Sequence, residues 1–110
     1  MPTKRIEKDP VLQTFMSGLS AVRDRLQQVV LFGSRARGDE KPYSDYDVLI
    51  VVKERDRDLV EAVHGAAIDA LLATERLVTP KIFRRRDFDR WSALPTPFFK
   101  NVLQEGVRIG

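Results

Sequence analysis

The stretch from Leu31 to Val52, LFGSRARGDEKPYSDYDVLIVV, indicates the fold more clearly than any other part of the chain. Two apolar runs, Gln28–Phe32 and Tyr46–Val52, flank a polar segment that contains Gly, Asp, Pro and Ser. Apolar runs of this length, rich in β-branched residues and bounded by turn-forming residues, are typical of strands. The stretch therefore predicts two strands that form a hairpin within a sheet covered by helices.

Helical patterns lie on both sides of this hairpin. Asp9 followed by Pro10 is typical of an N-cap and a first-turn proline, and apolar residues then recur at steps of three and four. This spacing predicts a helix over residues 10–26. A second helical pattern predicts a helix over residues 56–73, directly after the hairpin.

The C-terminal third continues the alternation of strands and helices. The run Leu77–Phe83 resembles a third strand, which Pro80 places at a sheet edge or a bulge. Asp87 is predicted to open a short helix, and Thr96 with the following proline to open another, which Gly106 ends. The predicted fold class is α/β (α+β), a small mixed sheet with helices packed on it.

Composition limits the classes of function. A chain of 110 residues that is 43% apolar fits one domain, residues 1–110. The absence of cysteine excludes disulfides, thiolate metal sites and cysteine nucleophiles. No apolar run approaches the roughly 20 residues of a membrane helix, and the first residues carry no apolar signal segment. We therefore expect a cytoplasmic protein without a membrane partner.

Charge and histidine content narrow the chemistry further. The chain has 19 basic and 16 acidic residues, and the resulting net charge of +3 is a weak indication of an anionic partner. The run Arg84–Arg86 lacks an aromatic-rich strand that could stack bases, so nucleic acid is disfavoured as a direct ligand. A solvated surface or a docking surface for an acidic partner is favoured. The single histidine excludes a His-rich metal site.

The Asp-x-Asp pair at the second strand suggests a metal site. Alternate side chains of a strand share a face, so Asp45 and Asp47 are predicted to project together while Tyr46 points away. Two adjacent carboxylates repel each other unless a cation lies between them. Oxygen ligands of this kind suit Mg²⁺, which completes its coordination with water and substrate phosphates. The pair therefore predicts a metal ion and a phosphate together.

The other side of the hairpin offers a matching phosphate site. Gly33 allows a phosphate to approach the backbone, and the hydroxyl of Ser34 can donate a hydrogen bond. The N–H groups of a following short helix would point toward an anion. Arg35 and Arg37 are additional cationic candidates, of which only one is expected to face the site because they are two residues apart.

Gly-Ser turns and Asp-x-Asp caps are each common, but their combination across ten intervening residues is specific. The segment GSRARGDEKPYSDYDVLIVV resembles the signature of the DNA polymerase beta-like nucleotidyltransferase superfamily. In detail it is similar to the minimal nucleotidyltransferases, small prokaryotic proteins often encoded beside a HEPN-domain protein. The segments IFRRRDFDRW and PFFKNVLQEGVRIG resemble the C-terminal part of such proteins.

The resemblance implies Mg²⁺-dependent transfer of a nucleoside monophosphate, most often AMP from ATP, to an acceptor hydroxyl. On this sequence Gly33, Ser34 and Arg37 would bind the nucleoside triphosphate, and Asp45 and Asp47 would hold the Mg²⁺ ions, of which two are expected. The acceptor implied is a tyrosine of a HEPN-type toxin. The chain would then be the antitoxin.

Members of the superfamily also place a third carboxylate on a later strand, which here contains no aspartate. Glu75 is the nearest acidic residue and is the candidate third catalytic carboxylate, at the leading edge of the predicted strand. Without it, acceptor activation would be slow or would need a group from the partner, because a tyrosine hydroxyl has a pKa of about 10. The alternative function is a catalytically weak or inactive binding module of the nucleotidyltransferase fold that neutralises or regulates its partner by direct contact. Transfer to a small molecule such as an aminoglycoside is disfavoured, because similar enzymes carry a large additional domain.

Overall fold

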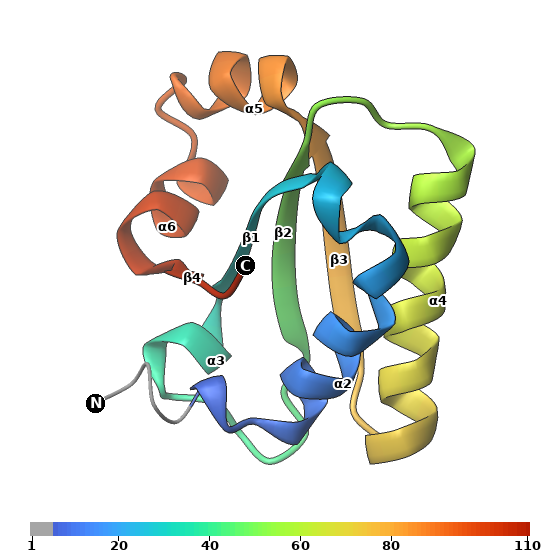
Figure 1. Cartoon of the computed structure of the whole chain (residues 1–110). Coiled ribbons are helices and arrows are strands. Elements are labelled where there is room, and N and C mark those ends of the chain that lie inside the picture. Colours follow the sequence, from blue (N-terminus) through green and yellow to red (C-terminus); the bar gives the residue numbers. More distant parts are fainter. Residues whose placement is uncertain (1–5) are drawn as a thin grey trace.

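The computed structural model describes residues 6–110, so the first five residues of the predicted domain 1–110 lie outside it. The strands form one sheet, and helices lie on both sides of it (Figure 1). The elements are α2 (Pro10–Gly18), the 3₁₀ helix η1 (Ser20–Arg25), β1 (Leu26–Phe32), α3 (Ser34–Arg37), β2 (Tyr46–Val52), α4 (Arg57–Thr74), β3 (Val78–Arg84), α5 (Arg85–Ser92), α6 (Pro97–Glu105) and β4 (Val107–Arg108).

The sheet has four strands in the order β3-β2-β1-β4. Strand β1 runs antiparallel to both β2 and β4, whereas β2 and β3 are parallel and joined through α4. A parallel pair requires such a long crossover, whereas the antiparallel pair β1–β2 is joined by a shorter connection. The mixed sheet confirms the predicted fold class, and the edge position of β3 agrees with the placement of Pro80.

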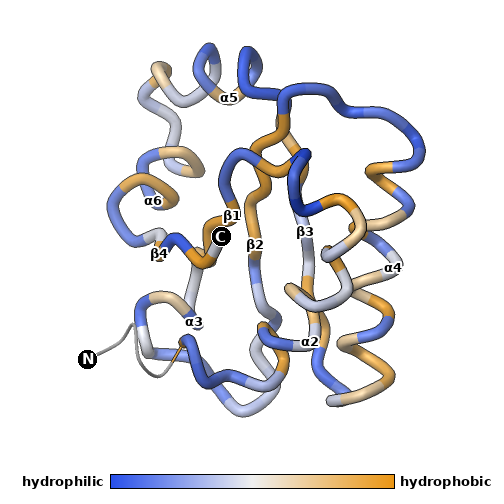
Figure 2. The backbone as a smooth tube through the Cα atoms, viewed as in Figure 1, coloured by the Kyte–Doolittle hydropathy of each residue, from blue (hydrophilic) through white to orange (hydrophobic). Residues whose placement is uncertain are grey.

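Helices cover the sheet on both faces, and the side chains of β2 alternate between two cores. Val48 and Ile50 belong to the core under α2 and α4, whereas Leu49 and Val51 belong to the core that also contains Phe99 of α6. Figure 2 shows hydrophobic colouring over most of β2 and more hydrophilic colouring at its end near α3. The polar residues of β2 are therefore confined to the end where the strand begins.

The predicted helix over residues 10–26 is wrong in its second half. The α-helix ends at Gly18, and a 3₁₀ helix follows. Gly18 lies against α4, and a Cβ added to it would be 2.8 Å from the Cβ of Ala66. Leu19 and Val22 remain buried because side chains three residues apart share a face in a 3₁₀ helix. The apolar spacing was compatible with both helix types.

The other element boundaries differ from the predicted ones by at most two residues. Thr96 is confirmed as the N-cap of α6, since its side-chain oxygen accepts a hydrogen bond from the N–H of Phe99. Gly106 ends α6 as predicted, although its backbone is extended, and a Cβ there would collide with the carbonyl oxygen of Val102. None of the helices within residues 6–110 combines the length and apolar character needed to cross a membrane.

Candidate functional site

The turn after β1 and the beginning of β2 are in direct contact. Phe32 pairs with Asp47 across the hairpin, which brings the next residue, Gly33, beside the Asp47 side chain. Gly33 has φ 77° and ψ −159°, a backbone conformation that favours glycine. A Cβ added to Gly33 would lie 2.6 Å from Oδ2 of Asp47. The predicted phosphate-binding turn and one predicted metal-binding carboxylate are therefore adjacent.

Helix α3 begins immediately at this contact. Gly33 is its N-cap, and the Gly33 carbonyl accepts hydrogen bonds from the N–H groups of Ala36 and Arg37. Ser34 is the first helical residue and is half-buried. The N–H groups of Ser34 and Arg35 precede these two donors and have no acceptor within the helix. The start of α3 therefore lies beside the Gly33 turn and the Asp47 carboxylate.

The Asp-x-Asp pair straddles the start of β2. Asp47 is half-buried within the strand, whereas Asp45 is exposed and lies one residue before the strand begins. Tyr46, between them, is 4% exposed and belongs to the core under α2 and α4. Tyr46 therefore points away from Asp47, as the alternation of the strand predicts.

Tyr46 anchors this part of β2 to the first turn of α2. Its hydroxyl donates a 2.6 Å hydrogen bond to Oδ2 of Asp9, while Oδ1 of Asp9 accepts hydrogen bonds from the N–H groups of Val11 and Leu12. Burial and the Asp9 carboxylate raise the pKa of Tyr46 to about 12. The sequence predicted Asp9 as a helix cap but gave no indication of its bond to Tyr46.

Thr79 of β3 completes the surroundings of Asp47. The parallel register of β2 and β3 pairs Asp47 with Thr79, and the Thr79 hydroxyl donates a 2.9 Å hydrogen bond to Oδ1 of Asp47. Sequence reasoning missed this residue because a threonine in an apolar run also fits an ordinary strand. Only the register of the two parallel strands identifies it.

Glu75 lies on a different element from the one predicted. Helix α4 extends to Thr74, and Glu75 is its C-cap, with a left-handed φ of 59° and an exposed side chain. Within residues 6–110, no hydrogen bond or ion pair joins its carboxylate to Asp45 or Asp47. The same residues contain no group of three or more His, Cys, Asp or Glu that could hold a metal ion. Among the described residues, no third acidic residue therefore joins Asp45 and Asp47.

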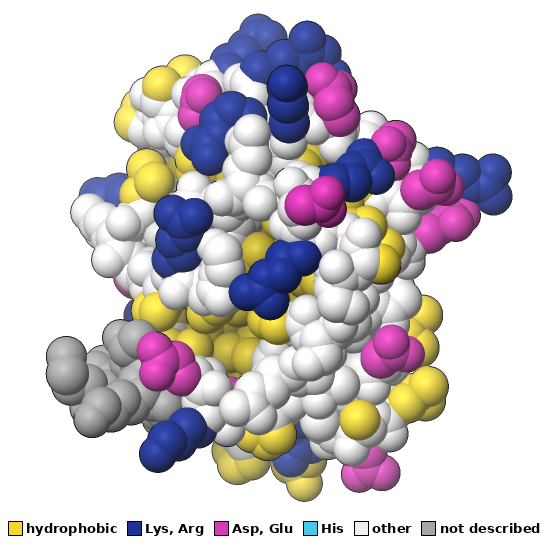
Figure 3. Space-filling model, in the orientation of Figure 1, with side chains coloured by type: hydrophobic (Ala, Val, Ile, Leu, Met, Phe, Trp, Pro, Cys, Tyr) yellow, Lys and Arg dark blue, Asp and Glu magenta, His cyan; other side chains and the backbone are white. Residues whose placement is uncertain are grey.

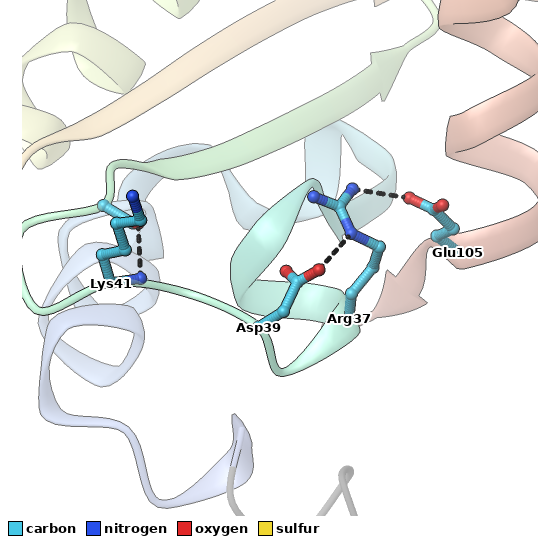
Figure 4. Close-up of polar contacts among 5 residues, drawn as sticks. Arg37, Asp39, Lys41 and Glu105 are labelled. Carbon is cyan, nitrogen blue, oxygen red and sulfur yellow. Dashed lines mark hydrogen bonds and ion pairs between the residues drawn. The ribbon is translucent and has the colours of Figure 1, made fainter.

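Arg37 is directed toward α6. Its Nη1 donates to Oε2 of Glu105 at 2.9 Å, and its Nε donates to Oδ2 of Asp39 at 3.1 Å (Figure 4). The carboxylates of Glu105 and Asp39 raise the pKa of Arg37. The guanidinium is partly exposed, so a phosphate could reach it only in competition with these two carboxylates.

Arg35 holds the loop that leads to Asp45. Its Nε and Nη2 donate to the carbonyl of Ser44 at 3.2 and 2.9 Å, and Nη2 also donates to the carbonyl of Pro42 at 3.3 Å. The guanidinium lies 4.3 Å from the centre of the Tyr46 ring. Because carbonyl oxygens and an aromatic ring surround the guanidinium, Arg35 stabilises the loop conformation.

The donor set fits a hard divalent cation. Asp45 and Asp47 offer carboxylate oxygens, and Mg²⁺ is commonly bound by one or two carboxylates together with water and substrate phosphates. Oδ2 of Asp47 faces the space that a side chain on Gly33 would occupy. A side chain at residue 33 would collide with that oxygen, so only glycine allows this close approach of the turn to the carboxylate. Asp45 and Asp47 could therefore hold Mg²⁺ beside the Gly33 turn.

The basic run Arg84–Arg86 is far from this site along the sheet. Arg84 pairs with Val52 at the opposite end of β2 from Asp47. Arg84 forms an ion pair with Asp87 at 2.8 Å, and Figure 3 shows basic side chains gathered over the α5 end of the molecule. This run therefore contributes nothing to the site at Gly33 and Asp47.

The sequence matches the nucleotidyltransferase domain family over residues 17–105. The chain belongs to this family. Two proteins of Methanocaldococcus jannaschii, each named as a candidate protein adenylyltransferase, are 34% and 49% identical to it. The first match covers 92% of this nucleotidyltransferase and 96% of the relative, and the second covers 90% and 95%.

Solved structures share the nucleotidyltransferase fold at low identity. A candidate nucleotidyltransferase from Sulfolobus solfataricus is 22% identical, with a TM-score of 0.57 over 97% of this chain and 81% of that one. A chain from a toxin–antitoxin complex with AMP-PNP is 19% identical, with a TM-score of 0.57 over 87% and 69%. A chain of the toxin–antitoxin pair MntA-HpeT is 17% identical, with a TM-score of 0.55 over 87% and 69%.

Proposed function

We propose that this nucleotidyltransferase moves AMP from ATP to a hydroxyl group, a tyrosine, of a HEPN-type toxin in the cytoplasm and so acts as the antitoxin. The observation that carries the proposal is the contact between the Gly33 turn and the Asp47 carboxylate. This contact combines a phosphate-binding backbone with a ligand for a divalent cation. The names of the two relatives support protein adenylylation, and the toxin–antitoxin neighbours support a toxin partner.

Each site residue has a role in this proposal. The Gly33 backbone and the Ser34 hydroxyl bind the triphosphate, and Asp45 and Asp47 hold Mg²⁺. When bound, Mg²⁺ neutralises charge that develops on the phosphates during an in-line displacement. The acceptor oxygen forms a bond to the α-phosphorus, the bond from that phosphorus to the bridging oxygen breaks, and pyrophosphate leaves.

The acceptor hydroxyl must also lose its proton. A tyrosine with a pKa of about 10 is almost fully protonated at neutral pH, so a base accelerates the transfer. Asp45 and Asp47 are occupied as metal ligands in this proposal, and Glu75 is exposed at the end of α4. We therefore infer that a group of the partner protein receives the proton, which leaves Glu75 as the alternative base within this chain.

Label transfer tests the proposal directly. The complex purified from its native cells is incubated with ATP labelled at the α-phosphate, and in parallel with ATP labelled at the γ-phosphate. We expect the partner to gain only the α-label and one or more AMP units in intact mass. The variant Asp45→Asn/Asp47→Asn should show neither. Equal transfer by wild type and variant would contradict the proposed mechanism.

A binding module is the second candidate function, and it is favoured because residues 6–110 place no third acidic group with Asp45 and Asp47. In that case the chain neutralises the toxin by covering its surface, and nucleotide binding is regulatory. The Asp45→Asn/Asp47→Asn variant would then neutralise the toxin completely. Loss of neutralisation while the complex stays intact would instead support catalysis.

A further inference from the structure

We propose that Thr79 is a positioning residue for Asp47, which fixes Oδ1 so that Oδ2 faces the turn at Gly33. The inference rests on the proposed function, because it assigns the carboxylate to a divalent cation. Thr79 would not touch the cation or the nucleotide itself. Its role would be to orient the carboxylate before either of them binds.

The first support is the geometry between the two parallel strands. Asp47 and Thr79 are paired in register, and Thr79 Oγ1 lies 2.9 Å from Asp47 Oδ1. The Tyr46 carbonyl is a second acceptor at 3.4 Å. A hydroxyl has one proton to donate, so the shorter contact to the carboxylate is the stronger hydrogen bond. The branched side chain of threonine also limits its rotation, which keeps the hydroxyl on this face.

The second support comes from the opposite side of the carboxylate. Oδ2 of Asp47 lies 2.6 Å from the position that a Cβ on Gly33 would take. Among residues 6–110, the contacts of Asp47 place a hydrogen-bond donor on Oδ1 and none on Oδ2. One oxygen is therefore held by β3, and the other faces the turn where the triphosphate is proposed to bind.

Fixing this carboxylate has a physical consequence for cation binding. The terminal torsion of an aspartate is broad, so an unsupported carboxylate samples many orientations. A hydrogen bond from a second residue restricts this rotation, and loss of such a bond typically weakens metal affinity or activity roughly 10- to 100-fold. Thr79 carries no charge, so it restricts Asp47 without adding the repulsion that a third carboxylate would bring in the absence of a cation.

Direct binding of Mn²⁺, measured by electron paramagnetic resonance on the full chain, tests the proposal without requiring turnover. The informative variants are Thr79→Val, which keeps the shape and removes the hydroxyl, and Thr79→Ser, which keeps the hydroxyl. Thr14→Val is a matched control, since the Thr14 hydroxyl donates to the Pro10 carbonyl in α2. We expect Thr79→Val to bind Mn²⁺ at least about tenfold more weakly than wild type. Thr79→Ser and Thr14→Val should bind Mn²⁺ as wild type does.

A kinetic measurement on the complex provides the second readout. For a positioning role, Thr79→Val raises the concentration of Mg²⁺ needed for half-maximal transfer, and saturating Mg²⁺ restores most of kcat. Thermal unfolding without metal checks that each variant is folded, and Thr79→Ala replaces Thr79→Val if the latter is not.

The outcomes separate this inference from the proposed function. Wild-type Mn²⁺ affinity in a folded Thr79→Val, or equal weakening in Thr79→Val and Thr79→Ser, would overturn the role of the hydroxyl while transfer by wild type stands. Failure of the wild type both to bind Mn²⁺ and to transfer AMP would overturn both proposals.

Discussion

The hydroxyl of Tyr46 donates a 2.6 Å hydrogen bond to the carboxylate of Asp9, although the two residues are 37 positions apart. Asp9 also caps α2, so one carboxylate joins the first turn of that helix to the strand that carries the proposed metal ligand. Tyr46 lies directly between Asp45 and Asp47 in the sequence. The placement of Asp47 therefore depends on a partly buried contact on the other face of the sheet.

Tyr46→Phe removes this hydrogen bond and leaves one oxygen of Asp9 without its partner. Hydrogen bonds to charged groups contribute about 1.5–3 kcal/mol, so we expect the free energy of unfolding to fall by about that amount. Tyr43→Phe is the matched control because Tyr43 is 83% exposed. Urea unfolding at neutral pH measures both variants, and an equal effect in the two would contradict a specific role of the Tyr46 hydroxyl.

Alkaline pH tests the same contact. The pKa of Tyr46 is raised to about 12 in the folded protein, above the value of about 10 in the unfolded chain. The folded state therefore holds the proton more tightly, and its stabilising contribution is complete below pH ~10 and lost as pH rises toward about 12. We expect the tyrosinate absorbance of Tyr46, followed in Tyr43→Phe, to appear in that upper range. Titration near pH 10 would contradict the burial of the hydroxyl.

Gly33→Ala should disrupt the site. Its Cβ would meet Asp47 Oδ2 at 2.6 Å, and an alanine in this backbone conformation costs about 1–3 kcal/mol. We expect loss of Mn²⁺ binding and transfer, with lower stability. Gly65→Ala in α4 is the control, because nothing lies within 4 Å of its Cβ, and it should raise stability by about 0.5–1 kcal/mol. Full activity in Gly33→Ala would rule out a close approach of ligand to this backbone.

Arg35→Gln should loosen the loop before Asp45. It removes the hydrogen bonds to the Pro42 and Ser44 carbonyls and the contact with the Tyr46 ring. We expect faster amide hydrogen exchange over residues 39–45 and weaker Mn²⁺ binding. Arg57→Gln is the control, since Arg57 forms an exposed ion pair with Glu61 of its own helix. Unchanged exchange in Arg35→Gln would show that other contacts hold the loop.

Substitutions at Arg37 and Glu105 should change the KM for ATP in opposite directions. If Arg37 contributes to triphosphate binding, Arg37→Gln raises the KM for ATP with little change in kcat. Glu105→Gln removes a carboxylate that competes for the same guanidinium, so it should lower that KM. Steady-state kinetics at saturating acceptor measures both values. An unchanged KM in both variants would leave Arg37 with a structural role only.

Two substitutions at Glu75 separate its backbone from its carboxylate. Glu75→Gly places glycine at the left-handed C-cap and should raise stability by up to about 1 kcal/mol. Glu75→Gln keeps the energetic cost of a non-glycine residue at the left-handed φ and removes the carboxylate. Because the Glu75 carboxylate forms no hydrogen bond or ion pair with Asp45 or Asp47, we expect Glu75→Gln to retain transfer. A tenfold or greater fall in its kcat would instead identify Glu75 as the base.

Short-range patterns predicted the parts of the fold that depend on neighbours in the sequence. The strands around Gly33 and Asp47, the cap at Thr96 and the edge position of β3 follow from spacing, turn residues and prolines. The end of α2 at Gly18 could not be predicted in this way, because Gly18 is explained by its contact with Ala66, which lies on a helix far along the chain. The apolar periodicity of one helix carries no information about where another helix will pack against it.

The contacts that orient the site were beyond prediction for the same reason. Thr79 reaches Asp47, and Asp9 reaches Tyr46, across 32 and 37 positions of sequence. Each contact depends on the register or packing of elements that single-sequence patterns do not specify. Glu75 was expected on a strand because it precedes an apolar run, whereas α4 continues as far as Thr74.

The hairpin of β1 and β2 has a consequence for the order in which the site assembles. Gly33 and Asp47 lie 14 positions apart and meet through an antiparallel pair, so closing that loop costs little chain entropy. The bond from Thr79 must wait until α4 has formed and β3 has docked in parallel. We therefore expect a nascent chain to bring the turn and the carboxylate together first, and the later docking of β3 to fix the carboxylate in its final orientation.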